Sequence, residues 1–319
     1  YVAMLAYVLL PMIGLGLLAS FVGAEDEDSN TNTATPPLPD PTPIEGTTGD
    51  DILNGTVTND LISGQEGGDA LRGFGGDDTL IGGAGDDLAI GNEGDDQLWG
   101  RTGDDTLWGR DGQDRLNGSF GNDVLRGDNG DDVLRGGSGD DALVGGAGDD
   151  ALIGNLGNDL IETGNGADTV FGGTGDDRIT GYHQPATDGF AAGEDDLLPD
   201  ELNGGSGEDT IIGNDGDTVT GGSGADLIGT IGFDQEEGGG VIVTDFNPVE
   251  DMLLLASSTG PDLSLDAESD RISVLQDANG EDSNVFLDGL LVAVLRDTDA
   301  AELAADTSWL ANIAEEPAP

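Results

Sequence analysis

The chain has 319 residues and a formal net charge of −57, because 66 acidic residues are balanced by only nine arginines and no lysine. This charge excludes nucleic acid as a partner, since a phosphate backbone is neutralised by Lys and Arg, and it favours cations. With 57 Gly, 12 Pro, 4% aromatic residues and no Cys, the composition excludes a disulfide framework and lies close to that of disordered chains.

Residues 1–24 carry no charged side chain and are predicted to form an N-terminal hydrophobic helix. At 1.5 Å per residue such a helix reaches about 36 Å, which is enough to span a bilayer. We expect a transmembrane anchor, and the alternative is a cleaved signal segment with Val22 and Ala24 at its small-residue positions. Residues 25–45 are an acidic, Pro-rich linker in which "PPLPDPTP" predicts a stiff polyproline spacer.

The segment from Gly46 to Thr180 divides without a gap into fifteen units of nine residues. The sixth slot is Asp in every unit and the eighth is aliphatic, while the first is Gly except at Thr163 and the fourth is Gly except at Thr58. Disordered sequence does not keep phase over such a length, so a folded repeat is predicted. Slots one to six have turn chemistry, and slots seven to nine predict a short strand whose middle side chain points inward.

Two units make one coil of 18 residues with a strand on each side, and successive coils stack at about 4.8 Å. The inward side chains then form two facing ladders, Leu107, Leu125 and Leu143 opposite Leu98, Leu116 and Leu134. Stacking also aligns the slot-six carboxylates, and each pair at roughly 5 Å costs about 0.8 kcal/mol even in water. Over more than a dozen pairs this rivals a domain's stability of about 5–15 kcal/mol, so a cation between the turns is required. Carboxylates and carbonyls without His or Cys favour Ca²⁺ over Mg²⁺.

The repeat resembles the repeats-in-toxin (RTX) nonapeptide family, whose pattern is Gly-Gly-x-Gly-x-Asp-x-aliphatic-x. The units "GGAGDDLAI" (82–90), "GGSGDDALV" (136–144) and "GGTGDDRIT" (172–180) match it almost residue for residue. The resemblance covers residues 46–229 and implies an all-β fold, a right-handed parallel β-roll that is a calcium-loaded solenoid. In that roll multiple Ca²⁺ ions lie between adjacent turns, held by slot-six side chains and by carbonyls of the first four slots.

The resemblance also implies which residues of this chain are ligands. The side-chain ligands are the slot-six aspartates Asp51, Asp60, Asp69, Asp78, Asp87, Asp96, Asp105, Asp114, Asp123, Asp132, Asp141, Asp150, Asp159, Asp168, Asp177, Asp209 and Asp226. The backbone carbonyl ligands belong to turn residues such as Gly82, Gly85, Gly136, Gly139, Gly145, Gly148, Gly172 and Gly175.

Three departures from the pattern are expected to alter the roll. Thr58 replaces a glycine and predicts a weakened or empty first site. A loop excursion is expected at about 182–199, after which Asp200 to Asn203 again fit slots six to nine. The unit "GNDGDTVT" is one residue short, so Asp217 is a less certain ligand.

From about residue 230 to 319 the period ends and apolar residues become denser. Strands are expected in "GVIVTDFNPVEDMLLLA", "DRISVLQD" and "SNVFLDGLLVAVLRD", with a turn at Asn279-Gly280. Asp299 and Glu302 fit a capping box that opens a short helix to about Ala305. This segment is similar to the β-rich caps that follow the last RTX repeats, and to the region that carries their secretion signal.

No catalytic constellation is visible, so we expect a protein that is not an enzyme. His183 lies in the predicted loop without zinc-ligand spacing, and Trp99 and Trp108 are predicted to point outward on opposite sheets. The favoured hypothesis is an exported calcium-binding RTX protein, extracellular or at the cell surface, that folds on binding calcium. The membrane is a partner through residues 1–24 if they are not cleaved.

Two alternatives are left open by the sequence. One is an RTX adhesin that binds a cell surface or a glycan, although no protein or glycan partner is identified. The other is an export or targeting module of an RTX enzyme, which requires a catalytic part outside this sequence.

Overall fold

The computed structural model describes residues 43–181, 198–214, 216–230, 240–255, 272–276, 282–287, 290–298, 300–305 and 310–311. The chain divides into two units, Tyr1–Asp40 and Pro41–Pro319, and the expected helix at 1–24 lies outside the described residues. Within the described ranges, no helix has both the length and the apolar character needed to cross a membrane.

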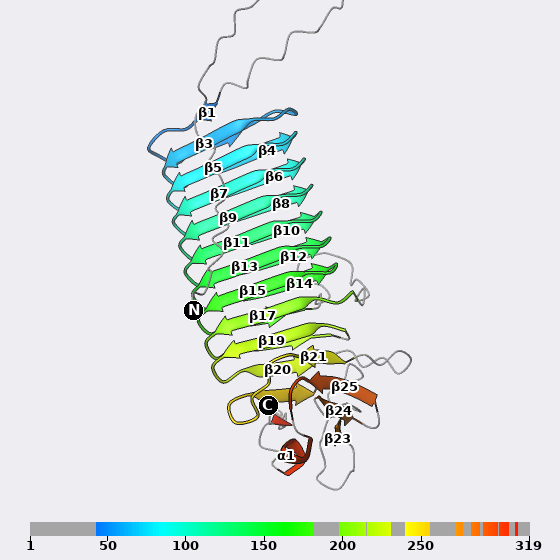
Figure 1. Cartoon of the computed structure of the whole chain (residues 1–319). Coiled ribbons are helices and arrows are strands. Elements are labelled where there is room, and N and C mark those ends of the chain that lie inside the picture. Colours follow the sequence, from blue (N-terminus) through cyan, green and yellow to red (C-terminus); the bar gives the residue numbers. More distant parts are fainter. Residues whose placement is uncertain are drawn as a thin grey trace, which may run out of the picture. The chain divides into compact units, whose positions relative to one another are not determined.

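Two sheets run the length of the second unit and form a parallel β-solenoid (Figure 1). Sheet A contains, in spatial order, β1 (Ile44–Glu45), β3 (Leu61–Glu66), β5 (Thr79–Ala84), β7 (Gln97–Thr102), β9 (Arg115–Phe120), β11 (Val133–Ser138), β13 (Ala151–Leu156), β15 (Thr169–Thr174), β17 (Glu201–Ser206), β19 (Thr218–Ser223), β21 (Val241–Val243), β25 (Leu290–Leu295), β24 (Ser283–Leu287) and β23 (Ile272–Gln276). Sheet B contains β2 (Ile52–Asn54), β4 (Ala70–Gly75), β6 (Leu88–Glu93), β8 (Thr106–Asp111), β10 (Val124–Asn129), β12 (Ala142–Ala147), β14 (Leu160–Asn165), β16 (Arg178–Thr180), β18 (Thr210–Gly213), β20 (Leu227–Thr230), β22 (Met252–Leu255) and β26 (Leu310–Ala311).

The strand register follows the 18-residue coil that the sequence predicts. In sheet B Leu125 pairs with Leu107 and Leu143, and in sheet A Leu116 pairs with Leu98 and Leu134. From Ile62 to Ile228 the slot-eight side chains of both sheets are at most 1% exposed and belong to one core. The two predicted aliphatic ladders are therefore confirmed, and a thin spine of one side chain per unit is the core of the solenoid.

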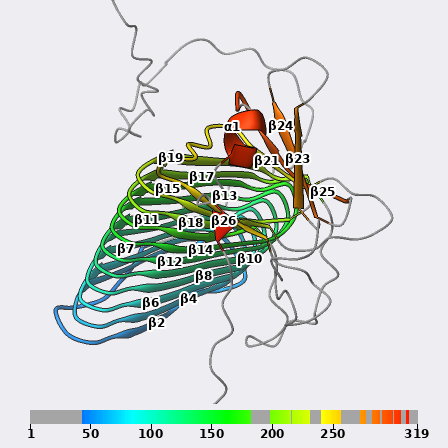
Figure 2. The same ribbon diagram turned by 90° about the horizontal axis from the view of Figure 1, so that it is seen from below.

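The strands are longer than expected. Slots seven to nine were predicted to form a strand of three residues, but most strands have six, such as β5, because they continue through slot three of the next unit. Beyond the slot-one glycine the chain keeps its pairing with the neighbouring coil, as at Gly83 and Arg101. The turn itself is therefore confined to slots four to six, where the two sheets are joined (Figure 2).

After Gly181 the register resumes at β17, whose Glu201 pairs with Thr169 of β15. Beyond β20 the repeat ends, and β21 and β22 add parallel strands to the two sheets. The segment expected as one strand at 283–297 forms two, because β24 and β25 are antiparallel neighbours. A D-G dipeptide at 288–289 is the hairpin signal that the single-strand interpretation overlooked. The helix α1 (Ala300–Ala305) ends where the sequence predicts, while Asp299 and the turn at 279–280 lie outside the described residues.

Candidate metal centre

The slot-six aspartates form two columns, one at each edge of the roll where the chain passes between the sheets. In each column the backbone N–H of one Asp donates to Oδ1 of the Asp one coil further on; Asp69 donates to Asp87 at 2.7 Å and Asp96 to Asp114 at 2.8 Å. The first column contains Asp51, Asp69, Asp87, Asp105, Asp123, Asp141, Asp159, Asp177, Asp209, Asp226 and Asp251. The second contains Asp60, Asp78, Asp96, Asp114, Asp132, Asp150, Asp168, Asp200 and Asp217.

These columns bring together every aspartate that the sequence predicts as a ligand. They also contain Asp200 and Asp217, whose slots the sequence marks, and Asp251, which the sequence interpretation missed. A signal for Asp251 was present, because Asp251-Met252-Leu253 repeats slots six to eight and Leu253 is fully buried. The loss of the glycine pattern before it concealed the position.

The second carboxylate oxygen of these aspartates is the unusual feature of the columns. In fourteen of them Oδ2 is buried and has no hydrogen-bond partner; these are Asp69, Asp78, Asp87, Asp96, Asp105, Asp114, Asp123, Asp132, Asp141, Asp150, Asp159, Asp177, Asp209 and Asp226. A buried polar atom without a partner costs about 1–3 kcal/mol, and more when it carries charge. Native chains do not repeat such a defect fourteen times unless another group satisfies it.

Oxygen atoms from adjacent coils converge next to the slot-one glycines. A Cβ built on Gly64 would overlap Oδ2 of Asp69 and would lie 2.7 Å from the carbonyl oxygen of Gly82 in the next coil. The same pair of oxygens meets at Gly127, with the carbonyl of Gly145 2.6 Å from the added carbon. Carboxylate and carbonyl oxygens are hard donors, and this set fits Ca²⁺.

The predicted carbonyl ligands occupy two kinds of position. Those in slot one, Gly82, Gly136, Gly145 and Gly172, lie beside the Asp Oδ2 of their own unit. Those in slot four, Gly85, Gly139, Gly148 and Gly175, have φ values of +121 to +129° and stack on the carbonyl of the same slot one coil earlier. No side chain fits there, because the carbonyl of the earlier coil occupies the place of a Cβ.

A strained backbone accompanies the buried oxygens. Eight non-glycine residues of the roll have φ between +78 and +96°, and all are in slot two; they are Gln65, Phe74, Asn92, Arg101, Arg110, Ser119, Asp128 and Asn155. Residues other than glycine avoid this region, and each costs on the order of 1–3 kcal/mol. In the turns of Gln65 and Phe74, for example, Oδ2 of the slot-six Asp69 and Asp78 accepts no N–H bond from slot two.

The first two turns have the opposite arrangement. The N–H and Oγ1 of Thr47 donate to Oδ2 of Asp51 at 2.6 and 2.8 Å, and Thr56 does the same to Asp60 at 2.6 and 2.9 Å. Neither threonine adopts positive φ, which β-branched residues avoid most strongly. In these turns the chain itself satisfies the carboxylate.

Two turns near the other end repeat this arrangement. The N–H of Asn214 donates to Oδ2 of Asp217 at 2.7 Å, and the N–H of Asn247 donates to Oδ2 of Asp251 at 2.7 Å. Both columns therefore begin and end with a carboxylate that its own turn satisfies. Between these ends, Oδ2 of Asp200 accepts from Oγ1 of Thr163 at 3.3 Å, while the fourteen Oδ2 atoms named above need a partner from outside the chain.

Burial raises the pKa of several interior slot-six carboxyls above the ordinary value of 3.8. The pKa of Asp150 rises to about 8 and that of Asp132 to about 7, although the N–H bonds to Oδ1 lower both. Repulsion from the charged neighbours Asp168 and Asp132 raises the pKa of Asp150 further. Carboxyls such as those of Asp132 and Asp150 therefore bind protons near neutral pH unless a cation replaces them.

The acidic residue that often stands in slot five, directly before the slot-six Asp, has a different role. Its side chain is exposed and accepts the slot-five N–H of the following coil, as Asp86 does from Asp104 at 2.9 Å and Asp95 from Gln113 at 2.9 Å. These side chains form an outer column of hydrogen bonds that links the turns.

Side chains alone do not complete a metal site. In the ranges that the structure describes, no three His, Cys, Asp or Glu side chains converge on one point. Any ion between the coils therefore depends on backbone carbonyls, which agrees with the convergence of one Oδ2 and one carbonyl at each slot-one glycine.

Comparison with known proteins identifies the repeats that form most of the two columns. No curated protein matches the chain. The RTX calcium-binding nonapeptide repeat matches it in overlapping copies that span residues 45–182 and 199–228, more than half of its length. The fold, the spacing of the buried aspartates and this match agree, and the chain belongs to the RTX calcium-binding nonapeptide repeat family.

Proposed function

We propose that this chain is an exported protein whose right-handed β-roll folds when Ca²⁺ binds between its stacked turns. The single observation that carries the proposal is the set of fourteen buried Oδ2 atoms without a hydrogen-bond partner, which lie in two columns. The repulsion between these carboxylates and their desolvation oppose folding. A divalent cation in each gap would replace the repulsion by attraction and would offset the desolvation. Metal binding energy then becomes folding energy.

The ligands in this proposal are the slot-six side chains and the carbonyls of slots one to four in adjacent turns. Turns with positive φ in slot two hold the ions, because their carboxylates have no partner within the turn. The carboxylates of Asp51 and Asp60 were interpreted from sequence as ligands like the rest. Since Thr47 and Thr56 already bond to them, we assign these two turns to an ion-free N-terminal cap of the roll.

Export and calcium are linked by the net charge of −57. Where calcium is scarce, repulsion keeps the repeat loose enough to pass through a secretion channel. Outside the cell, where modules with affinities of about 10⁻⁴ to 10⁻³ M bind calcium, the chain folds. We propose that residues 230–319 cover the last coil and contain the secretion signal, and that residues 1–24 are an anchor or a signal segment.

The proposal also assigns no catalytic role to this chain. The buried aspartates already have a structural role, and they lie inside the turns rather than in an open cleft. The calcium-dependent solenoid is therefore its main biochemical property.

Circular dichroism of the full chain during a calcium titration tests the proposal. In EGTA at neutral pH we expect little β-structure, followed by a cooperative gain as calcium rises toward about 1 mM. Magnesium should fail to replace calcium, since it gives up its waters reluctantly. Equal β-structure in EGTA and in calcium would refute the proposal.

A further inference from the structure

A groove on the outer face of sheet B is not part of the calcium columns. It has a volume of about 520 Å³ and is lined only by slot-two and slot-three residues of the successive strands β4, β6, β8 and β10. Phe74 and Asn92 lie toward one end, and Arg110, Asp128 and Asn129 toward the other. The rungs of this sheet are about 4.8 Å apart, so four of them form a strip about 14 Å long.

The slot-two residues of the groove are unfavourable for the backbone. Phe74, Asn92, Arg110 and Asp128 all have positive φ, between +78 and +96°, whereas the next two coils of the same sheet use Gly146 and Gly164 in that slot. Glycine would remove the strain of about 1–3 kcal/mol at each position. The same conformation occurs at Arg101 and Ser119 of sheet A, so it belongs to the repeat and does not by itself mark the groove. What is particular to the groove is that four consecutive coils of one sheet carry a side chain rather than glycine in slot two.

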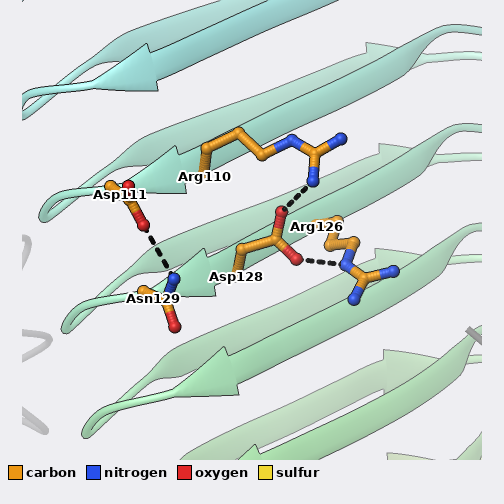
Figure 3. Close-up of polar contacts among 5 residues, drawn as sticks. All are labelled: Arg110, Asp111, Arg126, Asp128 and Asn129. Atoms are coloured by element: carbon orange, nitrogen blue, oxygen red, sulfur yellow. Dashed lines mark hydrogen bonds and ion pairs between the residues drawn. The ribbon is translucent and has the colours of Figure 1, made fainter. Parts of the chain in front are cut away.

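The polar groups of the groove are held in place by contacts across the rungs (Figure 3). Asp128 is only 3% exposed and forms ion pairs with Nε of Arg126 and with Nη1 of Arg110, the latter at 3.3 Å. The guanidinium of Arg110 also lies 4.8 Å from the centre of the Trp108 ring. Between the same two strands, β8 and β10, Nδ2 of Asn129 donates to Oδ1 of Asp111 at 2.7 Å. Groups that are already ordered lose little entropy when a ligand binds.

The charges of the groove exclude an anionic ligand. Asp128 already neutralises part of the positive charge of Arg110 and Arg126, and Glu93 and Asp111 add negative charge to the lining. The net charge of −57 repels anions from the whole surface. A purely apolar ligand is also excluded, because it would bury these charged groups without partners.

What the groove offers is one apolar ring beside fixed donors and acceptors. Phe74 is 42% exposed, and the guanidinium of Arg72 lies over its ring at 5.5 Å from the centre. Around it are carboxylates that only accept hydrogen bonds and amide and guanidinium groups that donate them. A pyranose ring combines an apolar face with hydroxyls that both donate and accept. We propose that this groove binds a segment of an uncharged polysaccharide, extended along the stack of rungs.

Glycine substitution separates this role from a structural one. Phe74→Gly removes the ring and relieves the positive φ, so the roll should stay as stable or become more stable while ligand affinity falls. Arg101→Gly is the matched control, because Arg101 has slot two and a φ of +88° on sheet A, away from the groove. Both substitutions leave the aspartate columns intact.

Affinity electrophoresis of the folded full chain in calcium, against uncharged and anionic polysaccharides, tests the proposal. An uncharged polymer should retard the native chain, Phe74→Gly should weaken its retention about tenfold or more, and Arg101→Gly should change it by less than about twofold. Retention only by anionic polymers, equal retention of both variants, or no retention by any polymer would overturn it. Circular dichroism of each sample measures the calcium-dependent fold separately. A chain that folds without calcium would refute the proposed function, and the retention data would still show whether the groove binds an uncharged polysaccharide.

Discussion

Replacing Asp132 by Asn is expected to change stability in opposite directions with and without calcium. The amide keeps the shape of the side chain and an oxygen that accepts the N–H of Asp114, which now donates to Oδ1 at 2.7 Å. It also keeps the backbone N–H that donates to Asp150 at 2.8 Å. The substitution therefore removes the charge at Oδ2 and little else.

Without calcium the substitution should stabilise the roll. Burial raises the pKa of Asp132 from 3.8 to about 7, so its ionisation in the folded chain at pH 8 opposes folding by on the order of 4 kcal/mol. A buried amide without a partner opposes folding by about 1–3 kcal/mol. The difference favours Asp132→Asn by on the order of 1–3 kcal/mol in chelator.

With calcium the sign reverses. A site that is filled at a thousand times its dissociation constant stabilises the folded state by about 4.1 kcal/mol, which exceeds the gain of about 1–3 kcal/mol in chelator, and this contribution is lost when the ligand charge is removed. Asp60→Asn is the matched control, because Oδ2 of Asp60 already accepts two hydrogen bonds from Thr56. Its effect in calcium should stay within about 1 kcal/mol.

Urea denaturation followed by circular dichroism measures both effects. One series is run in saturating calcium, and the other in EGTA with sucrose, an excluded osmolyte that favours the compact chain. Equal losses for Asp132→Asn and Asp60→Asn in calcium would refute the assignment of ions to the interior turns. A lower stability of Asp132→Asn in EGTA would refute the argument from the buried charge.

Three further predictions concern the pH, the core and the first turns. In EGTA, acidification from about pH 8 to about pH 5 should increase the β-structure seen by circular dichroism. The pKa of Asp150 is raised to about 8 in the folded chain, so the folded chain binds more protons than the unfolded chain and its stability falls as pH rises through this window. A loss of β-structure on acidification would contradict this prediction. Leu116→Ala should lower the free energy of unfolding in calcium by about 2–5 kcal/mol, and Phe120→Ala, which is 63% exposed on the same strand, by less than about 0.5 kcal/mol in urea denaturation. Thr56→Gly should allow positive φ in slot two and release Oδ2 of Asp60 from its bond to the slot-two N–H. The number of calcium ions bound per chain in equilibrium dialysis should then rise by about one. An unchanged number would contradict this prediction.

The nine-residue period was sufficient to predict the solenoid, its two sheets and its core. Each coil meets the next one in the same way, so the pairing of Leu107 with Leu125 follows from their spacing of two units. The same period also predicts that the slot-six aspartates align into columns. In a repeat protein each coil contacts only its neighbours, so the contacts between coils follow from the period alone.

The conformation of slot two could not be predicted in the same way. Its occupants, among them Gln65, Phe74 and Asp128, have no common chemistry, and nothing in their side chains requires positive φ. The conformation is imposed by the coils on either side. Only the threonines at 47 and 56 carried a local signal, because β-branched residues avoid that region. Asp251 was missed for a related reason, since its column continues after the glycines end.

The conformation of slot two and the presence of an ion in a turn are therefore linked. A slot-six Oδ2 is satisfied either by the N–H of its own turn, as Thr47 satisfies Asp51, or by something that enters from outside. The first option closes the turn on itself, and it occurs at both ends of the columns, where one coil has no further neighbour of the same kind. The second leaves a carboxylate that resists burial until a cation arrives. A chain with only the first option would fold without calcium, and a chain with only the second would have frayed ends.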